Sequence, residues 1–267
     1  MISKQIILPL ALSVGGTLSA EFVLVSDDFG GSSADSLNGA SADTFNSAVA
    51  SAGGSATWVA GTEFNADGSV DNGNTKQTAY LGLGSYVNDL KGSEDAIFTL
   101  EATMGINGSG SNGDRLTLGF FRSELPSYSI DGTFYTNDRG ALTFNLRESN
   151  AGSESDVYVG YGVDGGHNVG TYSGIGTYKF TTIVDLSTHN GATDFGSVSF
   201  YLDDVLLGST YDIAYDLDFS YVGFTNDNSG GGQLSNFSLT QVPEPSAYAL
   251  MAGVLGGCYV MLRRRKA

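Results

Sequence analysis

The feature that most constrains the fold is a succession of short segments in which apolar and polar residues alternate with a period of two. RLTLGFF and ALTFNLR, residues 115–121 and 141–147, are clear examples. Their apolar residues on one face are Leu116, Leu118 and Phe120 in the first segment and Leu142, Phe144 and Leu146 in the second. Alternation of this kind is typical of a strand with one face on a core. These two apolar rows are therefore expected to lie between packed sheets.

The same pattern predicts strands along almost the whole chain, separated by Gly, Asn, Asp and Ser. The predicted strands are residues 22–29, 57–64, 78–82, 96–106, 115–122, 133–136, 141–147, 156–161, 177–186, 197–207, 221–225 and 234–242. Residues 35–52 are expected to form a long loop with one helical turn. Many short strands with turn signals between them predict an all-β protein, a two-sheet antiparallel jelly-roll sandwich. No repeat or Pro-rich linker divides residues 21–241, so they are expected to form one domain.

The charge of this domain excludes one class of partner. The whole chain carries a formal charge of −17, but five of its 12 cations lie in the terminal segments. Residues 21–242 hold seven cations and 28 acids, a net charge of −21. Such a surface repels phosphate backbones, so no nucleic acid is expected to bind. Cys258 is the only cysteine, so the domain holds neither a disulfide nor a thiol nucleophile.

The first 20 residues have the layout of a secretory signal peptide. Lys4 precedes an apolar stretch at residues 6–14, and small residues precede Glu21. This order of charge, apolar stretch and small residues directs export and is removed by cleavage. The domain is therefore expected to be exported from the cytoplasm.

The last 26 residues, 242–267, consist of a Pro-Glu-Pro triplet, an uncharged stretch and a basic tail. Residues 247–262 would form a helix of about 24 Å, slightly short for the roughly 30 Å hydrocarbon core of a bilayer. The basic residues at 263–266 would stay on the cytoplasmic side of a membrane. We therefore expect a single transmembrane helix at 247–262 and an extracytoplasmic domain.

These three parts together resemble the PEP-CTERM protein-sorting signal of Gram-negative bacteria. The residues that carry the resemblance are Pro243, Glu244, Pro245, Arg263, Arg264 and Arg265. The resemblance implies that the partners are an exosortase, the secretion machinery and, at least transiently, the membrane. It also implies a membrane-anchored precursor that is processed and delivered to the cell envelope, the surface or an exopolysaccharide matrix. It leaves the activity of the domain open.

The second half of the domain resembles concanavalin-like and laminin-G-like jelly rolls. The stretch FYLDDVLLG, residues 200–208, is similar to the hairpin of those folds, with Asp204 at the position where glycine is usual. Aspartate tolerates the left-handed conformation that a tight hairpin turn needs. SDDF at 26–29 and SNF at 235–237 fit a fold whose first and last strands pair.

The residues that catalysis would need are scarce. His167 and His189 are the only histidines, both in Gly- and Asn-rich sequence, and no G-x-S-x-G elbow occurs. No two glutamates stand at i and i+2 or i and i+4 on one strand, as jelly-roll endoglucanases require. The G-x-G-x-x-G match at 160–165 lacks a following helix and is a glycine-rich turn. The domain is therefore expected not to be an enzyme.

No cofactor is required, but the loops suggest a structural calcium ion. Calcium takes carboxylate, amide and carbonyl oxygens as ligands. Asp27 and Asp28 with Asn236 form one candidate site. Asp28 is its preferred ligand, because in the concanavalin-like domains that the chain resembles a calcium ion often ties the first strand to the last. The other candidates are the loop with Asp67, Asp71 and Asn74 and the loop with Asn226 and Asp227. Solvated Asx turns are the alternative explanation for all three.

Tyrosines with polar neighbours suggest where a sugar would bind. Aromatic rings stack on pyranose faces while Asn, Asp and Arg side chains bind the hydroxyls. The candidate glycan-binding residues are Tyr128, Tyr135, Tyr158, Tyr161 and Tyr172. We expect a secreted, non-catalytic surface or matrix protein that binds extracellular polysaccharide. Two alternatives stay open: a glycoside hydrolase or polysaccharide lyase on the same fold, and a structural coat component without a ligand.

Overall fold

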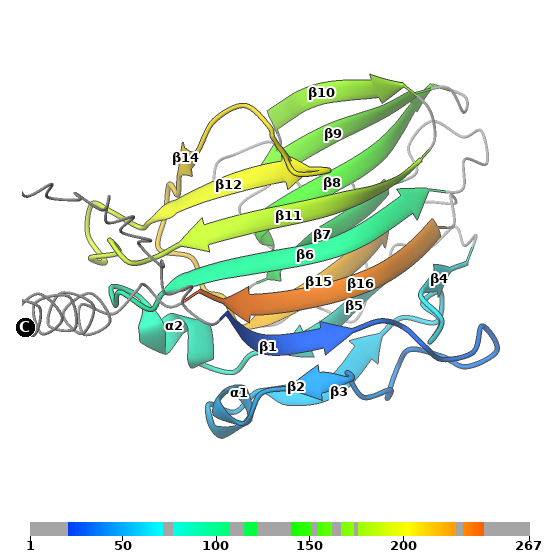
Figure 1. The fold of residues 1–267 in the computed structure, drawn as a ribbon, viewed down its shortest axis with the longest axis horizontal. Helices are drawn as coiled ribbons and strands as arrows, with labels where there is room; N and C mark the ends of the chain where they lie inside the picture. The colour runs from blue at the N-terminus through cyan, green and yellow to red at the C-terminus, as the bar shows by residue number, and fades with distance from the viewer. Residues whose placement is uncertain are drawn as a thin grey trace, which may run out of the picture. The chain divides into compact units, whose positions relative to one another are not determined.

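The fold is seen in a computed structural model (Figure 1). It describes residues 21–71, 77–106, 115–121, 140–150, 154–161, 167–173, 176–227 and 232–242. The predicted signal peptide and the predicted sorting signal from Pro243 onward lie outside the described residues, as does the predicted strand at 133–136. No helix among the residues described is long and apolar enough to cross a membrane.

The first sheet contains both the first and the last strand of the domain. Its strand order within the described residues is β13-β12-β11-β6-β16-β1-β2, with β14 on β12 and β4 on β16. The strands are β1 (Phe22–Asp27), β2 (Thr44–Phe45), β4 (Ser69–Val70), β6 (Ile97–Ile106), β11 (Thr177–Asp185), β12 (Ser197–Leu202), β13 (Val205–Leu206), β14 (Tyr211–Asp212) and β16 (Gly232–Gln241). The predicted pairing of the first strand with the last is confirmed, because β1 runs antiparallel to β16.

The second sheet packs behind the first (Figure 1). Its strand order within the described residues is β10-β9-β8-β7-β15-β5-β3. The strands are β3 (Ser55–Ala60), β5 (Gln77–Gly82), β7 (Arg115–Phe121), β8 (Gly140–Asn150), β9 (Glu154–Gly160), β10 (His167–Ser173) and β15 (Tyr221–Asp227). β6 and β7 are consecutive in the chain but lie in different sheets, and so do β15 and β16. All pairings between the strands that the structure describes are antiparallel, so the predicted two-sheet antiparallel sandwich is confirmed.

The core lies between the two sheets and is built from the predicted alternation. All six residues of the apolar rows in β7 and β8 are buried. Phe144 of the second sheet meets Phe180 and Phe200 of the first edge to face, with ring centroids 4.5 and 5.4 Å apart. Burying a side chain of this size stabilises a fold by about 1.5–3 kcal/mol. A domain without disulfides can therefore hold its two sheets together by apolar area.

The turns agree with the sequence in most places. The predicted strand at 197–207 is the β12–β13 hairpin, whose turn residues Asp203 and Asp204 have φ of 48° and 64°. The Lys179 backbone N–H donates to the Asp203 side chain at 2.8 Å and fixes this turn. The expected helical turn is α1 (Ser47–Ser51), where the Asn46 side chain accepts from the Ala48 N–H at 2.9 Å.

One helix and four strands among the described residues were not predicted from the sequence. These are α2 (Tyr86–Leu90) and the strands β2, β4, β10 and β14. β10 was read as part of a glycine-rich loop, but it pairs with β9 at one edge of the second sheet. The other three strands have two residues each, which is too short to show alternation. Such short strands form because they pair with a neighbouring strand in the tertiary structure, so no local sequence pattern predicts them.

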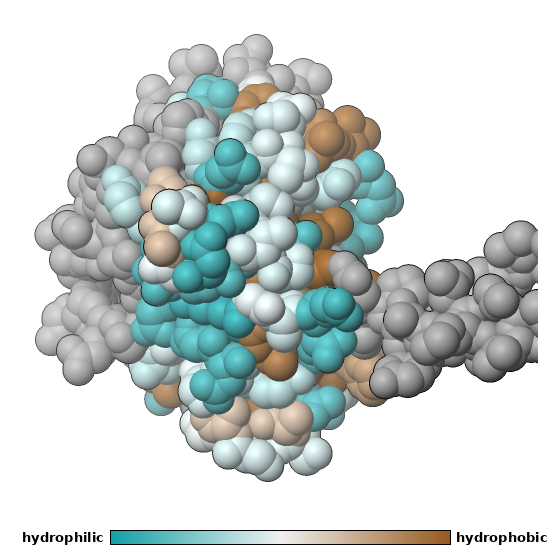
Figure 2. All heavy atoms as spheres, turned by 90° about the vertical axis from the view of Figure 1, so that its left-hand side faces the viewer, coloured by the Kyte–Doolittle hydropathy of each residue, from teal (hydrophilic) through white to brown (hydrophobic). Residues whose placement is uncertain are grey.

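Figure 2 shows a hydrophilic patch on one face of the sandwich, with neutral and hydrophobic residues around it. Asp216 joins the segment after α2 to the loop after β11, because its carboxylate accepts from Lys91 Nζ at 2.8 Å and lies 3.0 Å from His189 Nε2. The Lys91 hydrogen bond is the main reason why the pKa of Asp216 is lowered. The Lys91 ammonium also lies 5.5 Å from the centre of the Phe219 ring. This contact fixes α2 to the loop before β15.

Candidate functional site

Three carboxylates gather where β1 ends. Asp27 is the last residue of β1, Asp28 follows it, and Asp43 precedes β2, which pairs with β1 through Ser26 and Thr44. One carboxylate oxygen from each lies within 4.8 Å of the others, close enough to share one metal ion. The Asp28 N–H also donates to Asp43 Oδ2 at 2.9 Å. Asp27 is buried, whereas Asp28 and Asp43 are exposed.

Asp27 is fixed by the aromatic core beneath it. Trp58 Nε1 donates to its Oδ2 at 2.6 Å, and the Phe29 N–H donates to its Oδ1 at 2.8 Å. Phe29 has a φ of 57°, so the chain turns sharply to place its N–H there. Trp58 itself is fully buried, stacked 6.0 Å from Phe224 and edge-on 5.3 Å from Phe237. The carboxylate is therefore held in place before any ligand arrives.

The electrostatics of the three carboxylates favour a cation. Burial raises the pKa of Asp27 above its ordinary value of 3.8, and the hydrogen bonds from Trp58 and Phe29 offset part of that rise. The negative charges of Asp43 and Asp28 raise the pKa further. A divalent cation would neutralise all three groups, and oxygen ligands of this kind suit calcium. The group Asp27, Asp28 and Asp43 is therefore a candidate metal site.

The predicted calcium ligand Asn236 lies in an irregularity of β16. It has a φ of 52°, and the pairing of β16 with β1 brings Asp27 opposite Phe237, its neighbour. Its amide Nδ2 donates weakly to Ser235 Oγ at 3.4 Å. Asn236 thus lies on β16 and Asp28 directly follows β1, the strand that pairs with β16, while the carboxylates close to Asp28 are those of Asp27 and Asp43. Asp43 was missed, because only the pairing of β1 with β2 brings it there.

The other predicted calcium loop is held by internal hydrogen bonds. Asp67 Oδ1 accepts from the Ser69 N–H at 2.9 Å and from its hydroxyl at 2.5 Å, which lowers the pKa of Asp67. Asp71 Oδ1 accepts from Asn65 Nδ2 at 3.0 Å. Asn226, the third candidate, donates through Nδ2 to the buried Glu63 at 3.0 Å. These side chains are engaged in turn and strand contacts.

A polar row crosses the second sheet on the face directed away from the core. The strand registers align Tyr158 of β9, Asn145 of β8, Thr117 of β7, Thr225 of β15 and Thr78 of β5. The residues on either side of this row along the strands are core residues, such as Leu116 and Leu118 beside Thr117. We call these five residues the polar row. This row could not be predicted from the sequence, since its members come from five separate strands.

Two side chains of the polar row have a hydrogen-bonding group without a partner. The Thr117 hydroxyl donates to Asn145 Oδ1, so the amide of Asn145 has its oxygen engaged. Asn145 Nδ2 and Thr225 Oγ1 are buried and make no hydrogen bond. Leaving a buried donor unmatched costs roughly 1–3 kcal/mol, so such groups usually have a partner. A bound ligand that offers acceptor oxygens would supply one.

The predicted glycan-binding tyrosines do not all share one surface. Tyr158 belongs to the polar row and is partly exposed. Tyr161 packs on the core side, stacked on Tyr211 with ring centroids 4.5 Å apart. Tyr172 lies in β10, but its side chain is outside the described part, and Tyr128 and Tyr135 are outside it altogether. The polar row therefore brings Tyr158 together with side chains other than the predicted ones.

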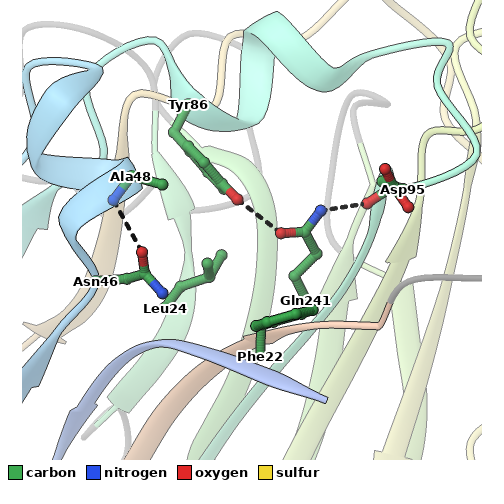
Figure 3. A pocket seen from close by; sticks show the side chains of 7 residues that line it. All are labelled: Phe22, Leu24, Asn46, Ala48, Tyr86, Asp95 and Gln241. Carbon is green, nitrogen blue, oxygen red and sulfur yellow. Dashed lines mark hydrogen bonds between the residues drawn. The ribbon is translucent and has the colours of Figure 1, made fainter. Parts of the chain in front are cut away.

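A cavity of about 340 Å³ opens beside α1 and α2, where β1 begins and β16 ends (Figure 3). The Tyr86 hydroxyl donates to Gln241 Oε1 at 2.7 Å, and Gln241 Nε2 donates to the Asp95 backbone oxygen at 2.8 Å. Phe22, which is 54% exposed, lies at its edge. The Tyr86 hydroxyl, the Gln241 amide and the Asn46 side chain shown in Figure 3 are thus engaged in hydrogen bonds within the protein.

The fold and the carboxylates define an all-β two-sheet sandwich with a candidate metal site. No protein-family model matches the sequence, and no curated protein matches it. Among solved structures, the carbohydrate recognition domain of Emp47p is 12% identical, with a TM-score of 0.42, over 70% of this chain and 88% of that chain.

Two further solved structures are similar to the chain. The carbohydrate esterase of Shiga toxin-encoding bacteriophage phi24B is 9% identical, with a TM-score of 0.44, over 83% of this chain and 99% of that chain. The alginate lyase Aly36B is 13% identical, with a TM-score of 0.40, over 81% of this chain and 95% of that chain.

Proposed function

We propose that the chain is an exported, non-catalytic glycan-binding protein that an exosortase delivers to the cell surface or extracellular matrix. The observation that carries glycan binding is the polar row, where a partly exposed tyrosine adjoins buried donors that lack partners. Sugar sites combine these two elements, an aromatic ring and a few placed hydrogen-bond donors. A calcium ion held by Asp27, Asp28 and Asp43 would have a structural role.

Glycan-array binding by the exported protein tests this function. We expect retention of extracellular polysaccharides, and we expect Tyr158→Ala to weaken it by about 3- to 10-fold, because stacking on an aromatic ring contributes about 0.5–1.5 kcal/mol. Tyr215→Ala is the matched control, since Tyr215 is 46% exposed, lies between β14 and β15 and is not a member of the polar row. Running the array with and without a chelator separates the calcium site from the sugar site. Absence of binding under both conditions would leave the coat-component alternative.

Delivery by an exosortase rests on the sorting signal in the sequence. If the signal is processed, the mature protein lacks residues 263–266, whose basic side chains act only as a cytoplasmic stop. The measurement is the intact mass of protein isolated from its native host. A mass that retains the basic tail would contradict processing and favour a permanent anchor.

A polysaccharide lyase is the second candidate function. Arg115, Asn145 and Tyr158 stand on three adjacent strands, β7, β8 and β9, and supply a cation, an amide donor and a phenol that can transfer a proton. A lyase would release unsaturated products that absorb ultraviolet light from an acidic polysaccharide. Loss of this release in Tyr158→Phe, with binding retained, would support catalysis over binding alone.

A further inference from the structure

The cavity beside α1 and α2 brings together both ends of the domain. Its lining side chains come from β1, the start of α1, α2, the segment before β6 and the end of β16. The register of β1 and β16, which pairs Phe22 with Gln241, places the first and the last strand side by side there. Its volume of about 340 Å³ lies at the lower end of the roughly 300–1,000 Å³ that ligand pockets have. The cavity therefore suits a small ligand.

Gln241 places an amide of fixed orientation in this cavity. The residue is 7% exposed. The Asp95 backbone oxygen only accepts hydrogen bonds, so the amide nitrogen of Gln241 must face it, and the amide oxygen must face the Tyr86 hydroxyl. An amide nitrogen carries two N–H groups and an amide oxygen has two lone pairs, so each has capacity for one further hydrogen bond. The amide is thus oriented before a ligand arrives, which lowers the cost of binding.

Asn46 supplies a second oriented amide, and Figure 3 shows Leu24 between it and Gln241. Asn46 is the N-cap of α1, and its Oδ1 accepts from the Ala48 N–H at 2.9 Å. Its Nδ2 donates to the Val23 backbone oxygen at 3.3 Å. The other N–H of Nδ2 is a further donor. The cavity therefore has two amides whose orientation is fixed by the elements that carry them.

An exposed aromatic ring adjoins these amides. Phe22 is 54% exposed, although Leu24, two residues further along the same face of β1, is 1% exposed. Phe22 is the only exposed phenylalanine in the part of the chain that the structure describes. The Tyr86 ring also lines the cavity, and Figure 3 shows both rings beside Gln241. An open aromatic ring next to a few placed polar groups is the combination that a sugar ring uses.

The charge around the cavity disfavours anionic ligands. Asp95 is exposed, and its backbone oxygen rather than its carboxylate binds Gln241. Burial raises the pKa of the Tyr86 hydroxyl, and the negative charge of Asp95 raises that pKa further, which shows that the carboxylate acts on the cavity. No lysine or arginine is among the described residues that line it. An anionic group would be repelled here, whereas a neutral hydroxyl group donates to the carboxylate.

We propose that this cavity is a second sugar site, separate from the polar row, which takes a neutral saccharide unit of a polysaccharide. The inference rests on the proposed glycan-binding function. The sugar ring stacks on Phe22, and its hydroxyl groups accept from the amides of Gln241 and Asn46 and donate to the carboxylate of Asp95. Because the site offers two amides and a carboxylate but no cation, it selects neutral sugars over acidic ones.

Binding of neutral and acidic disaccharides to the exported protein, measured by isothermal titration calorimetry, tests this site. The neutral probes are maltose, cellobiose and laminaribiose, and the acidic probes are digalacturonate and dimannuronate. We expect at least one neutral disaccharide to bind at least about fivefold more tightly than both acidic ones, the factor that about 1 kcal/mol of repulsion between two nearby charges in water produces. Tighter binding of an acidic disaccharide would overturn the inference. Retention of polysaccharides on the glycan array without binding of any disaccharide would overturn the cavity site and leave the glycan-binding function intact, whereas absence of both would overturn both.

Phe22→Ala tests the position of the sugar ring. We expect it to weaken binding of the neutral disaccharide by about 3- to 10-fold through the loss of stacking, with little change in Tm because the side chain is more than half exposed. Val205→Ala is the matched control, since Val205 is 64% exposed on β13, at the other edge of the first sheet from β2. Binding that Tyr158→Ala weakens and Phe22→Ala leaves unchanged would place the sugar on the polar row and overturn the cavity site.

Asp95→Asn tests the selection by charge. It keeps the size of the side chain and the backbone oxygen that binds Gln241, so we expect the fold to be retained and the preference for neutral over acidic disaccharides to fall to about twofold or less. Asp89→Asn is the matched control, because Asp89 is an exposed acid of α2 whose carboxylate accepts from the Ser85 hydroxyl. A preference that is unchanged in Asp95→Asn would overturn the assignment of neutral sugars to this cavity.

Discussion

Replacing Trp58 with alanine is expected to lower the free energy of unfolding by about 3–5 kcal/mol, the usual cost of removing a buried tryptophan. Trp58 is fully buried in β3 and stacks against Phe224 of β15 and Phe237 of β16, which belong to different sheets. Its indole N–H also donates to the buried Asp27. The substitution therefore opens a cavity between the sheets and removes one hydrogen bond from a buried carboxylate.

Urea unfolding followed by far-ultraviolet circular dichroism measures this effect, because the variant has lost the only tryptophan and its fluorescence. Trp58→Phe separates the two contributions: it keeps an aromatic ring, removes the N–H, and is expected to cost about 1–3 kcal/mol. Val59→Ala is the matched control. The Val59 side chain is next to Trp58 in the chain and is 46% exposed, so its truncation should change the free energy of unfolding by no more than about 0.5 kcal/mol. A Trp58→Ala effect as small as that of the control would contradict the role of Trp58 in joining the sheets.

Calcium is expected to raise the Tm of the protein by about 5–10 °C when present at 100 times its dissociation constant. Binding at that excess stabilises the folded state by about 2.7 kcal/mol, and each kcal/mol raises the Tm of a domain of this size by about 2–4 °C. The double variant Asp28→Asn with Asp43→Asn removes two of the three carboxylates and should abolish the response. Thermal unfolding with added calcium and with a chelator measures the shift in Tm for the parent and for the double variant.

The response should also depend on pH through Asp27. Because the pKa of Asp27 is raised in the folded state, the stability that this group contributes is fully present below 3.8 and is lost as the pH rises through the raised pKa. Calcium binds the ionised form and reverses this loss, so its effect on Tm should be larger at pH 7 than at pH 4. Asp212→Asn, an exposed acid on β14, is the control. A calcium response that is unchanged in the double variant would place the ion elsewhere.

Much of the fold could be predicted because strand alternation is a local signal. The rows of Leu116 and Phe144 were recognised from their own segments, and both are buried as expected. The hairpin at 200–208 was predicted from its resemblance to concanavalin-like folds, and Asp204 adopts the left-handed conformation that aspartate tolerates. Short edge elements such as β14 were missed, since their geometry is imposed by the strand with which they pair.

The candidate sites were harder to predict, because they depend on the register between strands. Asp28 was chosen from the sequence, yet Asp43 joins it only because Ser26 pairs with Thr44. Thr117 and Asn145 are 28 positions apart in the chain and hydrogen-bonded in the structure. A shift of one residue in either strand would turn these side chains toward the core. The sequence contains the polar residues but not the register that aligns them.

The all-β class and the two-sheet antiparallel sandwich could be predicted from the sequence, because residue alternation and turn chemistry are local properties. The pairing of the first and last strands was predicted from the resemblance to concanavalin-like folds, and the structure confirms it. The tertiary structure alone decided that Asp43 joins Asp27 and Asp28, and that Tyr158, Asn145, Thr117 and Thr225 form one row. The physical reason is that side chains distant in the chain meet only after antiparallel pairing has fixed the register of every strand.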